Sequence, residues 1–428
     1  MMLSLALGLS SKRPRTTSRS PATPDGPDHL SPLPVEMVEE ILRRLPLDDA
    51  VRTSALAKPW RYRWAECPGL ELVAGDPPAA VDAVLNRYTC NVSRAQLDVP
   101  EESYCKIDGW LRALATKGIR YLVVCFTPVL LLRLPLLPSS LFSCRELTSL
   151  LLKHCDIPPL PPSFDSFPNL LALQLDDVSF VENGERTFEA LIAKCPSLRS
   201  LILLFPSIGS DHMHEGNYSD WTIRAPNLKH FIISAWQDYG WRIDDLPLIE
   251  EARVHLEGPE LPRILPGLSK VKNLSVEITD DTIVERLSYF MNLKDLSLHT
   301  ILITKSSTVL SMFCILRNAP NLEDLRITSL HESEENDEVN MEELLNAQRT
   351  VGLFSRLKCF CLFESIGHTN EMQFIEFLMS KATVLQEIEI SVRDDGSKSP
   401  EVVFDELSQY KKASPQAEVI VNRTRSTT

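Results

Sequence analysis

The sequence predicts an α/β protein in which a short helical unit is followed by a curved solenoid, with a sheet on one face and helices on the outside. Two observations predict this fold. Apolar residues at helical spacing, interrupted by prolines, cover residues 28–72. From about residue 90, a frame with apolar residues at its first, fourth and sixth positions recurs almost to the end of the chain. A recurring frame indicates stacked units that share one continuous core.

The chain begins with an arm, residues 1–27, that is rich in Ser, Thr, Pro and basic residues. Too few apolar residues are present to bury a core, so we expect this arm to be disordered. We expect the same of the tail, residues 422–428. The run Lys12-Arg13-Pro14-Arg15 has the composition of a nuclear import signal, but basic runs are also common on tails. The nucleus, the cytoplasm or both are therefore the expected location.

The helical unit has a regular apolar stripe formed by Leu33, Met37, Val38, Ile41, Leu42 and Leu45. Pro34 suits a first helical turn, whereas Pro46 ends the helix because its ring interrupts the hydrogen-bond ladder. Two further short helices are expected, the last running from Pro59 to Trp64. About 45 residues with two tryptophans are too few to bury every apolar side chain, so we expect the surplus to face a partner.

The order of motifs in this unit resembles the F-box of plant proteins. The resemblance lies in Leu33-Pro34, Ile41-Leu42, Leu45-Pro46, Asp49-Ala50-Val51-Arg52-Thr53-Ser54 and Lys58-x-Trp60-Arg61-x-x-Trp64. It implies docking on the Skp-type adaptor of a cullin ubiquitin ligase, through Leu33, Pro34, Ile41, Leu42, Leu45, Pro46, Val51, Trp60 and Trp64. Pro59 departs from the family, which usually has a basic residue there, and a kink at this position would weaken adaptor binding.

The solenoid is predicted from eleven frames that follow one another at about 27 residues on average. They begin at Ile119, Leu147, Leu170, Leu198, Leu228, Ile249, Val271, Leu293, Leu322, Leu357 and Leu385. This period is typical of leucine-rich repeats, each a strand followed by a returning helix. We expect repeats over 90–352. Residues 353–421 resemble the FBD domain of plant F-box proteins, through Leu357-Lys358-Cys359-Phe360 and Ala382-Thr383-Val384-Leu385-Gln386-Glu387-Ile388. This region also fits a terminal, capping part of the same solenoid.

The frame leucines are expected to be core, and the residues between and just after the last two frame positions are expected to line the concave face. These target-binding candidates are Leu151, Lys153, Gln174, Asp176, Ile202, Leu204, Ile232, Arg253, His255, His299 and Arg326. Leu151, Ile202, Leu204 and Ile232 would together form an apolar patch. The alternative is that loops fold over these residues.

Composition and missing motifs exclude several classes of function. A net charge of −14 argues against general binding to nucleic acid, and prolines interrupt the longest apolar run, so we expect no membrane span. Ten cysteines without a CxxC pair fit a reducing compartment. No nucleotide-binding or nucleophile motif occurs, so we expect no catalytic residue, no metal and no cofactor. His212 and His214 lie near carboxylates, but we interpret them as part of a solvated loop.

The sequence therefore predicts a non-catalytic substrate-recognition subunit of an SCF-type cullin–RING ubiquitin ligase. The F-box would dock on the adaptor while the repeats hold an unknown target protein. The alternative is a leucine-rich-repeat scaffold or sequestering protein that does not act in a ligase, which Pro59 favours.

Overall fold

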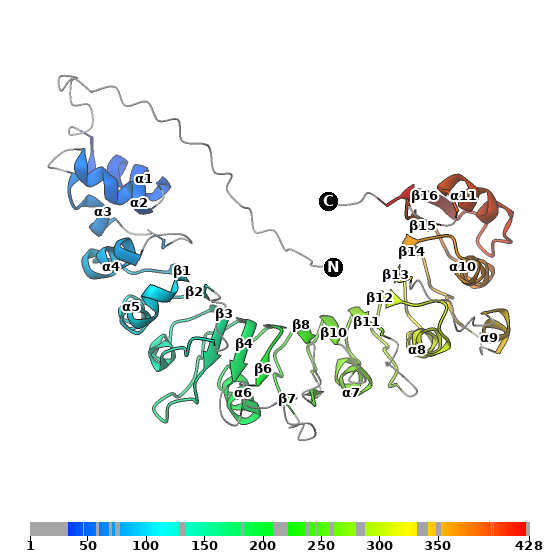
Figure 1. The fold of residues 1–428 in the computed structure, drawn as a ribbon, viewed down its shortest axis with the longest axis horizontal. Coiled ribbons are helices and arrows are strands. Elements are labelled where there is room, and N and C mark those ends of the chain that lie inside the picture. The colour runs from blue at the N-terminus through cyan, green and yellow to red at the C-terminus, as the bar shows by residue number, and fades with distance from the viewer. Residues whose placement is uncertain are drawn as a thin grey trace.

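In the computed structural model the described residues are 33–45, 47–56, 60–67, 71–72, 78–127, 134–180, 184–208, 221–235, 240–244, 246–256, 261–279, 287–331, 341–347, 352–394, 396 and 398–424. They form an open arc with strands along its inner side and helices along its outer side, as Figure 1 shows. The N-terminal helices lie at one end of the arc and α11 at the other. The predicted α/β solenoid is confirmed.

The helical segments lie in the N-terminal unit and on the outside of the arc. They are α1 Val35–Arg44, α2 Leu47–Arg52, η1 Thr53–Ala55, α3 Arg63–Glu66, α4 Pro78–Arg87, η3 Glu101–Lys106, α5 Ile107–Thr116, η4 Ser139–Ser143, α6 Gly184–Ala193, α7 Leu261–Ile264, η5 Leu265–Leu268, α8 Ser306–Arg317, α9 Met341–Ala347, α10 Thr369–Lys381 and α11 Pro400–Gln409. Helices α6, α8 and α10 follow β4, β12 and β14, as expected for repeats in which a strand is followed by a returning helix.

The strands form one long parallel sheet and one small sheet. They are β1 Arg94–Val99, β2 Tyr121–Phe126, β3 Ser149–Ile157, β4 Ala172–Phe180, β5 Ser200–Leu204, β6 Ser207–Ile208, β7 Thr222–Ile223, β8 His230–Ala235, β9 Arg242–Ile243, β10 Glu251–Leu256, β11 Asn273–Glu277, β12 Asp295–Ile301, β13 Asp324–Ser329, β14 Cys359–Ser365, β15 Glu387–Val392 and β16 Glu418–Arg423. The long sheet runs β1-β2-β3-β4-β5-β8-β10-β11-β12-β13-β14-β15-β16, with β6 beside β4, whereas β7 pairs with β9. Each of the eleven predicted frames contributes one strand of the long sheet.

Besides the short β6, the two end strands of the long sheet, β1 and β16, fall outside the predicted frames. In β1 the pattern is present as Val92, Ala95 and Leu97, which are all buried, but alanine gives a weak apolar signal. In β16 only Val419 and Val421 fit the frame, and both are partly buried against the core. Among the described residues β16 pairs with a strand on one side only, so it buries less surface and needs fewer large apolar residues.

The repeat stacking is fixed by the frame itself and by the residue before it. Frame residues such as Leu150, Leu173 and Leu201 are at most 2% exposed. Asn227 and Asn321 precede frame leucines, and their side-chain amides donate to backbone carbonyls of the previous repeat, at Pro196 (2.8 Å) and Met291 (2.7 Å). These two units are therefore hydrogen-bonded to their neighbours outside the strands as well as within them.

Five non-glycine residues have a left-handed backbone at the same place in the frame, two positions after its last apolar residue. They are His154, Asp177, Phe205, Thr300 and Glu364, with φ between 48° and 60°. A left-handed residue reverses the side-chain alternation of a strand. Cys155, Val178 and Ile301, which come next, are consequently buried. In these five repeats, alternation therefore predicts which side chains lie on the concave face only as far as the left-handed residue.

The expectation of one helix per repeat is wrong for part of the solenoid. Residues 158–171, between β3 and β4, contain no helix. Five prolines in this segment explain the difference, because a proline in a helix interior removes a hydrogen bond and clashes with the preceding turn. Sheet stacking continues through this segment because it depends on the strands and not on the outer connections.

The N-terminal unit packs against the first repeat and shares its core. The Tyr88 hydroxyl donates to the carbonyl of Cys67 (2.7 Å), and the backbone N–H of Thr89 donates to the carbonyl of Ala65 (2.9 Å). Leu72 forms a parallel bridge with Ala95 at the outer edge of β1. These contacts close the first end of the sheet.

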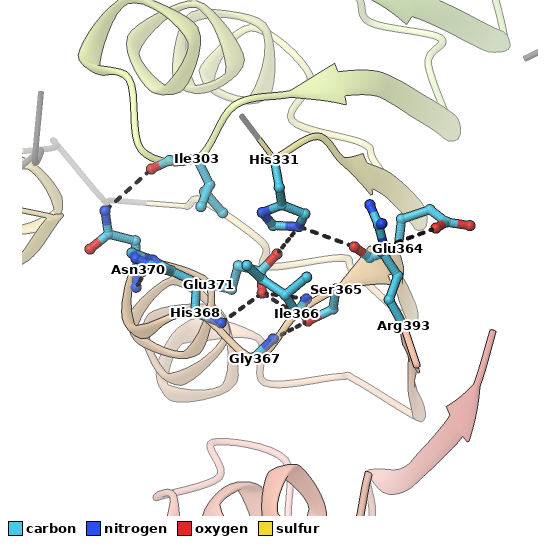
Figure 2. Close-up of polar contacts among 10 residues, drawn as sticks. All are labelled: Ile303, His331, Glu364, Ser365, Ile366, Gly367, His368, Asn370, Glu371 and Arg393. Atoms are coloured by element: carbon cyan, nitrogen blue, oxygen red, sulfur yellow. Dashed lines mark hydrogen bonds and ion pairs between the residues drawn. The ribbon is translucent and has the colours of Figure 1, made fainter. Parts of the chain in front are cut away.

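The C-terminal region continues the same sheet, since β14 pairs with β13 and β15 with β14. It is held by the fully buried carboxylate of Glu371 in α10 (Figure 2). Oε2 accepts hydrogen bonds from Ser365 Oγ (2.8 Å) and from the backbone N–H groups of Ile366 (3.2 Å) and His368 (3.0 Å). Nε2 of His331, which follows β13, lies 3.4 Å from Oε1. One side chain thus ties the start of α10 to two neighbouring strands.

The structure corrects the predicted start of the C-terminal tail. Asn422 and Arg423 belong to β16, and the backbone N–H of Thr424 donates to the carbonyl of Val392 (2.8 Å). The apolar pattern ends before these hydrogen bonds do, and the sequence therefore placed the boundary too early. The N-terminal arm, Pro46, Pro59, the His212–His214 loop and residues 425–428 lie outside the described residues.

Candidate interaction surfaces

Three of the predicted adaptor-binding residues, Leu42, Trp60 and Trp64, lie inside the N-terminal unit and not on its surface. They are 0%, 3% and 1% exposed. Trp64 also donates from Nε1 to Ser54 Oγ (3.0 Å). Their role in this structure is to hold the short helices together, because a side chain with almost no exposed surface cannot contact a partner directly.

The other predicted adaptor-binding residues lie nearer the surface. Pro34 and Ile41 are exposed, and Leu33, Leu45 and Val51 are half-buried. The unit exposes further apolar side chains that the sequence did not single out as contacts, namely Val35, Met37, Leu56 and Tyr62, at 45–59%. Exposed apolar groups on a small unit form a surface suited to another protein.

Charged groups of α1 lie on the same helix as this apolar surface. Arg44 Nη2 lies 2.7 Å from Glu40 Oε1, and Arg43 lies within 3.7 Å of carboxylates of both Glu39 and Glu40. These exposed pairs add little stability. The charged residues form a polar strip on the helix that also carries exposed apolar residues, and protein-binding sites usually combine an apolar centre with a polar rim.

The strands of the long sheet lie along the inner side of the arc (Figure 1), and the strand register arranges the target-binding candidates in columns across them. The strand register places Leu151, Gln174, Ile202, Ile232 and Arg253 side by side, and Lys153, Asp176, Leu204, Ser234 and His255 side by side. His299 and Arg326 lie farther along the same face, on β12 and β13. Arg326 is exposed and the other candidates are half-buried, because each packs on its neighbours in the column.

The predicted apolar patch is divided in two. Gln174 lies between Leu151 and Ile202 in the register, so Leu151 adjoins Val123 on one side of it. On the other side, Ile202, Leu204 and Ile232 form a continuous group on β5 and β8. Beside the division, Lys153 Nζ lies 2.8 Å from Asp176 Oδ2, and this hydrogen bond raises the pKa of Lys153. The face therefore presents two apolar groups separated by polar side chains.

The middle of the concave face carries a polar cluster around His299. Its Nε2 lies 3.1 Å from Ser275 Oγ, and its Nδ1 lies 3.3 Å from Thr328 Oγ1. His255 Nδ1 lies 3.5 Å from Glu277 Oε2. Burial lowers the pKa of His299, assisted by the nearby His255, and the hydrogen bond from His255 lowers the pKa of Glu277. Burial thus favours the neutral form of His299, whereas the hydrogen bond from His255 favours the ionised form of Glu277.

Sequence reasoning missed several members of the concave face. Ser275 and Glu277 of β11 belong to the polar cluster, and Glu251 lies 2.8 Å from Arg253. The signal was available for Ser275 and Glu277. They stand just before and just after the last apolar residue of their frame, the same two positions that selected the other candidates.

The described part of the chain offers little for catalysis or metal binding. Among the described residues, no group of three or more His, Cys, Asp or Glu side chains is arranged to hold a metal ion. All ten cysteines are free, and burial raises the pKa of Cys144 to about 12, which keeps this thiol protonated and unreactive. No described helix combines the length and apolar character needed to cross a bilayer.

Two family models match the chain. The F-box domain model matches residues 30–70, and the model described as "FBD-associated F-box protein At5g56370, LRR repeats" matches residues 107–257. The first match covers the N-terminal unit and the second covers α5 to the end of β10. The predicted resemblances to an F-box and to leucine-rich repeats are confirmed.

Curated relatives match over most of their length. An F-box/FBD/LRR-repeat protein of Arabidopsis thaliana is 27% identical, over 92% of this chain and 99% of the relative. An FBD-associated F-box protein of the same plant is 25% identical, over 85% of this chain and 100% of the relative. Among solved structures, an internalin of Listeria monocytogenes is 13% identical with a TM-score of 0.33, covering 74% of this chain and 78% of that chain.

Proposed function

Because this chain is a plant-type F-box/leucine-rich-repeat protein with an FBD-associated region, we propose that it is the substrate receptor of an SCF-type cullin–RING ubiquitin ligase. The F-box binds a Skp-type adaptor, and the concave face of the repeats binds the target protein. The chain contributes no bond-making residue. Ubiquitin transfer is the task of the other subunits.

The observation that carries this proposal is the separation of two unlike surfaces on one continuous core. The F-box helices, which carry exposed apolar residues, lie at one end of the arc, and the strands that carry the concave candidates lie along its inner side (Figure 1). A single buried core runs from Val38 to Ala417. A rigid connection of this kind holds a bound target at a fixed position relative to the adaptor.

The mechanism follows from effective concentration. A target lysine held near a loaded conjugating enzyme meets it at a local concentration that can reach the millimolar range. The receptor needs affinity for two partners and a stiff link between them. Shared side-chain packing supplies that stiffness at the F-box end, where Tyr88 and Thr89 hydrogen-bond to the F-box backbone.

A second candidate function is a scaffold or sequestering protein whose repeats bind a target without a ligase. It is favoured by the departure of Pro59 from the F-box pattern. Both functions fit an intracellular site of action in the nucleus or cytoplasm, which we also propose; the ten free cysteines suit a reducing compartment.

The test is reconstitution of the full chain with a Skp-type adaptor, a cullin and its RING partner. We expect the four proteins to elute together, and we expect Met37→Glu to abolish co-elution while leaving the thermal transition unchanged. Leu330→Glu is the matched control, since Leu330 is an exposed apolar residue (41%) outside the F-box. Folded wild-type chain that forms no complex would overturn the ligase proposal and favour the scaffold.

A further inference from the structure

The two edges of the long sheet differ. At the first edge, the backbone N–H of Leu72 donates to the carbonyl of Arg94 (3.3 Å), and the N–H of Gln96 donates to the carbonyl of Leu72 (3.0 Å). At the last edge, β16 pairs with β15, and within the described residues it has no strand on its other side. An uncovered edge strand presents a row of hydrogen-bonding groups that can pair with another chain.

The register identifies the groups that point away from the sheet. The N–H of Glu418 donates to the carbonyl of Gln386, and the N–H of Thr424 donates to that of Val392. Because backbone groups alternate between the two sides of a strand, Val419, Val421 and Arg423 direct their N–H and C=O groups toward the open edge.

The side chains at this edge are apolar at its centre. Val419 and Val421 pack partly buried against the core, and Ile420 is half-buried on the concave face. The charged residues of β16, Glu418 and Arg423, lie at its two ends, and its centre, residues 419–421, carries no charge or proline of the kind that protects an open edge. On α11, which packs against β16, Val402 and Phe404 are 50% and 44% exposed. Exposed apolar side chains are thus present on the helix that packs against the last strand.

We propose that β16 is the interface between two copies of this chain, which pair antiparallel about a two-fold axis at Ile420. This register places Ile420 opposite Ile420 of the second copy, Val419 opposite Val421, and Glu418 opposite Asn422. The outward-facing backbone groups of Val419 and Val421 then face one another and form a hydrogen-bonded pair. The inference goes beyond the proposed function, because it does not depend on the adaptor or on the target.

Self-complementarity favours a second copy over another occupant. A two-fold interface requires that each residue find a suitable partner in the same strand run backwards. β16 meets this requirement, since valine faces valine and the carboxylate of Glu418 faces the amide of Asn422. Leu72 blocks the opposite edge of the sheet. This contact disfavours head-to-tail pairing of β16 with β1, and a two-fold interface that uses β16 of both copies stops at two copies.

The first test is the molar mass of the full chain, measured by light scattering at tens of micromolar, alone and with the adaptor bound. We expect two copies per particle. Ile420→Lys places two cations face to face, and Val421→Pro removes an outward N–H without disturbing the bonds to β15, so each should halve the mass. Ser297→Lys is the control, because Ser297 occupies the same column on the interior strand β12 and should leave the dimer intact.

Unchanged thermal transitions of the variants separate lost pairing from lost folding. Wild-type chain that is monomeric at these concentrations would overturn the proposal. It would also be overturned by a dimer that survives both β16 substitutions, or by β16 accepting an extended segment of another protein while the chain alone stays monomeric.

A second test examines the register directly. Two residues opposite each other in a non-hydrogen-bonded antiparallel pair have Cα atoms about 4.5 Å apart, within the range that a disulfide spans. Ile420→Cys should therefore give a disulfide-linked dimer under mild oxidation. Ile232→Cys, at an equivalent half-buried position of the interior strand β8, should not. Absence of the cross-link in a folded Ile420→Cys chain would contradict pairing at this residue.

Discussion

The F-box and the repeats use their apolar motifs differently. In the repeats, the frame residues are buried and the residues between them line the concave face, as alternation requires. In the F-box, Leu42 and Trp64 of the motif are buried, whereas Met37 and Tyr62, which lie outside it, are exposed by more than half. A family motif in short helices therefore records what holds the unit together as much as what binds a partner.

The largest effect is expected inside the F-box, from Trp64→Ala. The indole is 1% exposed and hydrogen-bonded to Ser54, so its removal should lower the free energy of unfolding by about 3–5 kcal/mol. Because the F-box shares the core of the solenoid, the loss should appear in chemical denaturation of the whole chain. A variant as stable as wild type that no longer binds the adaptor would show that Trp64 is a contact residue instead.

A slightly smaller effect is expected at the other end of the solenoid, from Glu371→Ala. The substitution leaves the Ser365 hydroxyl and the N–H groups of Ile366 and His368 without their acceptor, at a cost of about 2–4 kcal/mol. Ser380→Ala, at an exposed hydroxyl of the same helix, serves as the control. Adaptor affinity should be unchanged in both variants. If Glu371→Ala lowered the free energy of unfolding by less than about 1 kcal/mol, this result would contradict the anchoring role of the carboxylate.

A moderate, pH-dependent effect is expected on the concave face. Burial holds the pKa of His299 below its ordinary value of 6.5, so below that pH the unfolded chain takes up a proton that the folded chain does not. The free energy of unfolding should therefore fall as the pH is lowered from about 7 toward 5. His299→Gln should flatten this dependence, whereas His230→Gln, at an exposed histidine, should retain it. An unchanged slope for His299→Gln in denaturation at several pH values would contradict the assignment.

The carboxylate of Glu277, in the same cluster, affects the free energy of unfolding at lower pH than His299 does. The pKa of Glu277 is held below its ordinary value of 4.5 by the hydrogen bond from His255. Its contribution to stability is therefore present above about 4.5 and is lost only as the pH falls further, through the folded pKa. Loss of stability between pH 7 and 5 is thus assigned to the imidazole and not to the carboxylate.

The smallest effect is expected from Arg326→Glu. This side chain is exposed on the concave face, and substitutions of this kind usually change stability by no more than about 0.5 kcal/mol. The substitution reverses a charge on the proposed target surface, so the set of proteins ubiquitylated by the reconstituted ligase should change. An identical set would place the target elsewhere on the chain.

The difference between the two regions also explains what the sequence predicted well. The positions of the strands and the burial of the frame leucines could be predicted, because side chains alternate between the two faces of a strand and each residue can lie on only one of them. Gln174 could have been recognised as a divider of the apolar patch, because it holds the same frame position as Leu151 and Ile202 in the repeat between them, and the strand register follows the frames. The connection before β4 departs from one helix per repeat because its prolines exclude a helix, and the end of β16 was placed too early because its backbone hydrogen bonds continue beyond the apolar pattern.

In the F-box, orientation was harder to predict. Helices α2 and α3 have six and four residues, too few for a stripe to distinguish a buried face from an exposed one. The first repeat also covers part of the unit through Tyr88 and Thr89. Residues 28–72 alone contain no signal for this contact.

The most direct test compares two adjacent residues of α1, Ile41 and Leu42, which are 38% and 0% exposed. Adaptor affinity and thermal stability would be measured for Ile41→Glu and Leu42→Ala in the full chain. We predict that Ile41→Glu abolishes binding at an unchanged melting temperature, and that Leu42→Ala lowers the melting temperature and retains binding wherever the chain remains folded. Wild-type affinity in a folded Ile41→Glu chain would contradict an adaptor surface built from the outward apolar residues of the F-box.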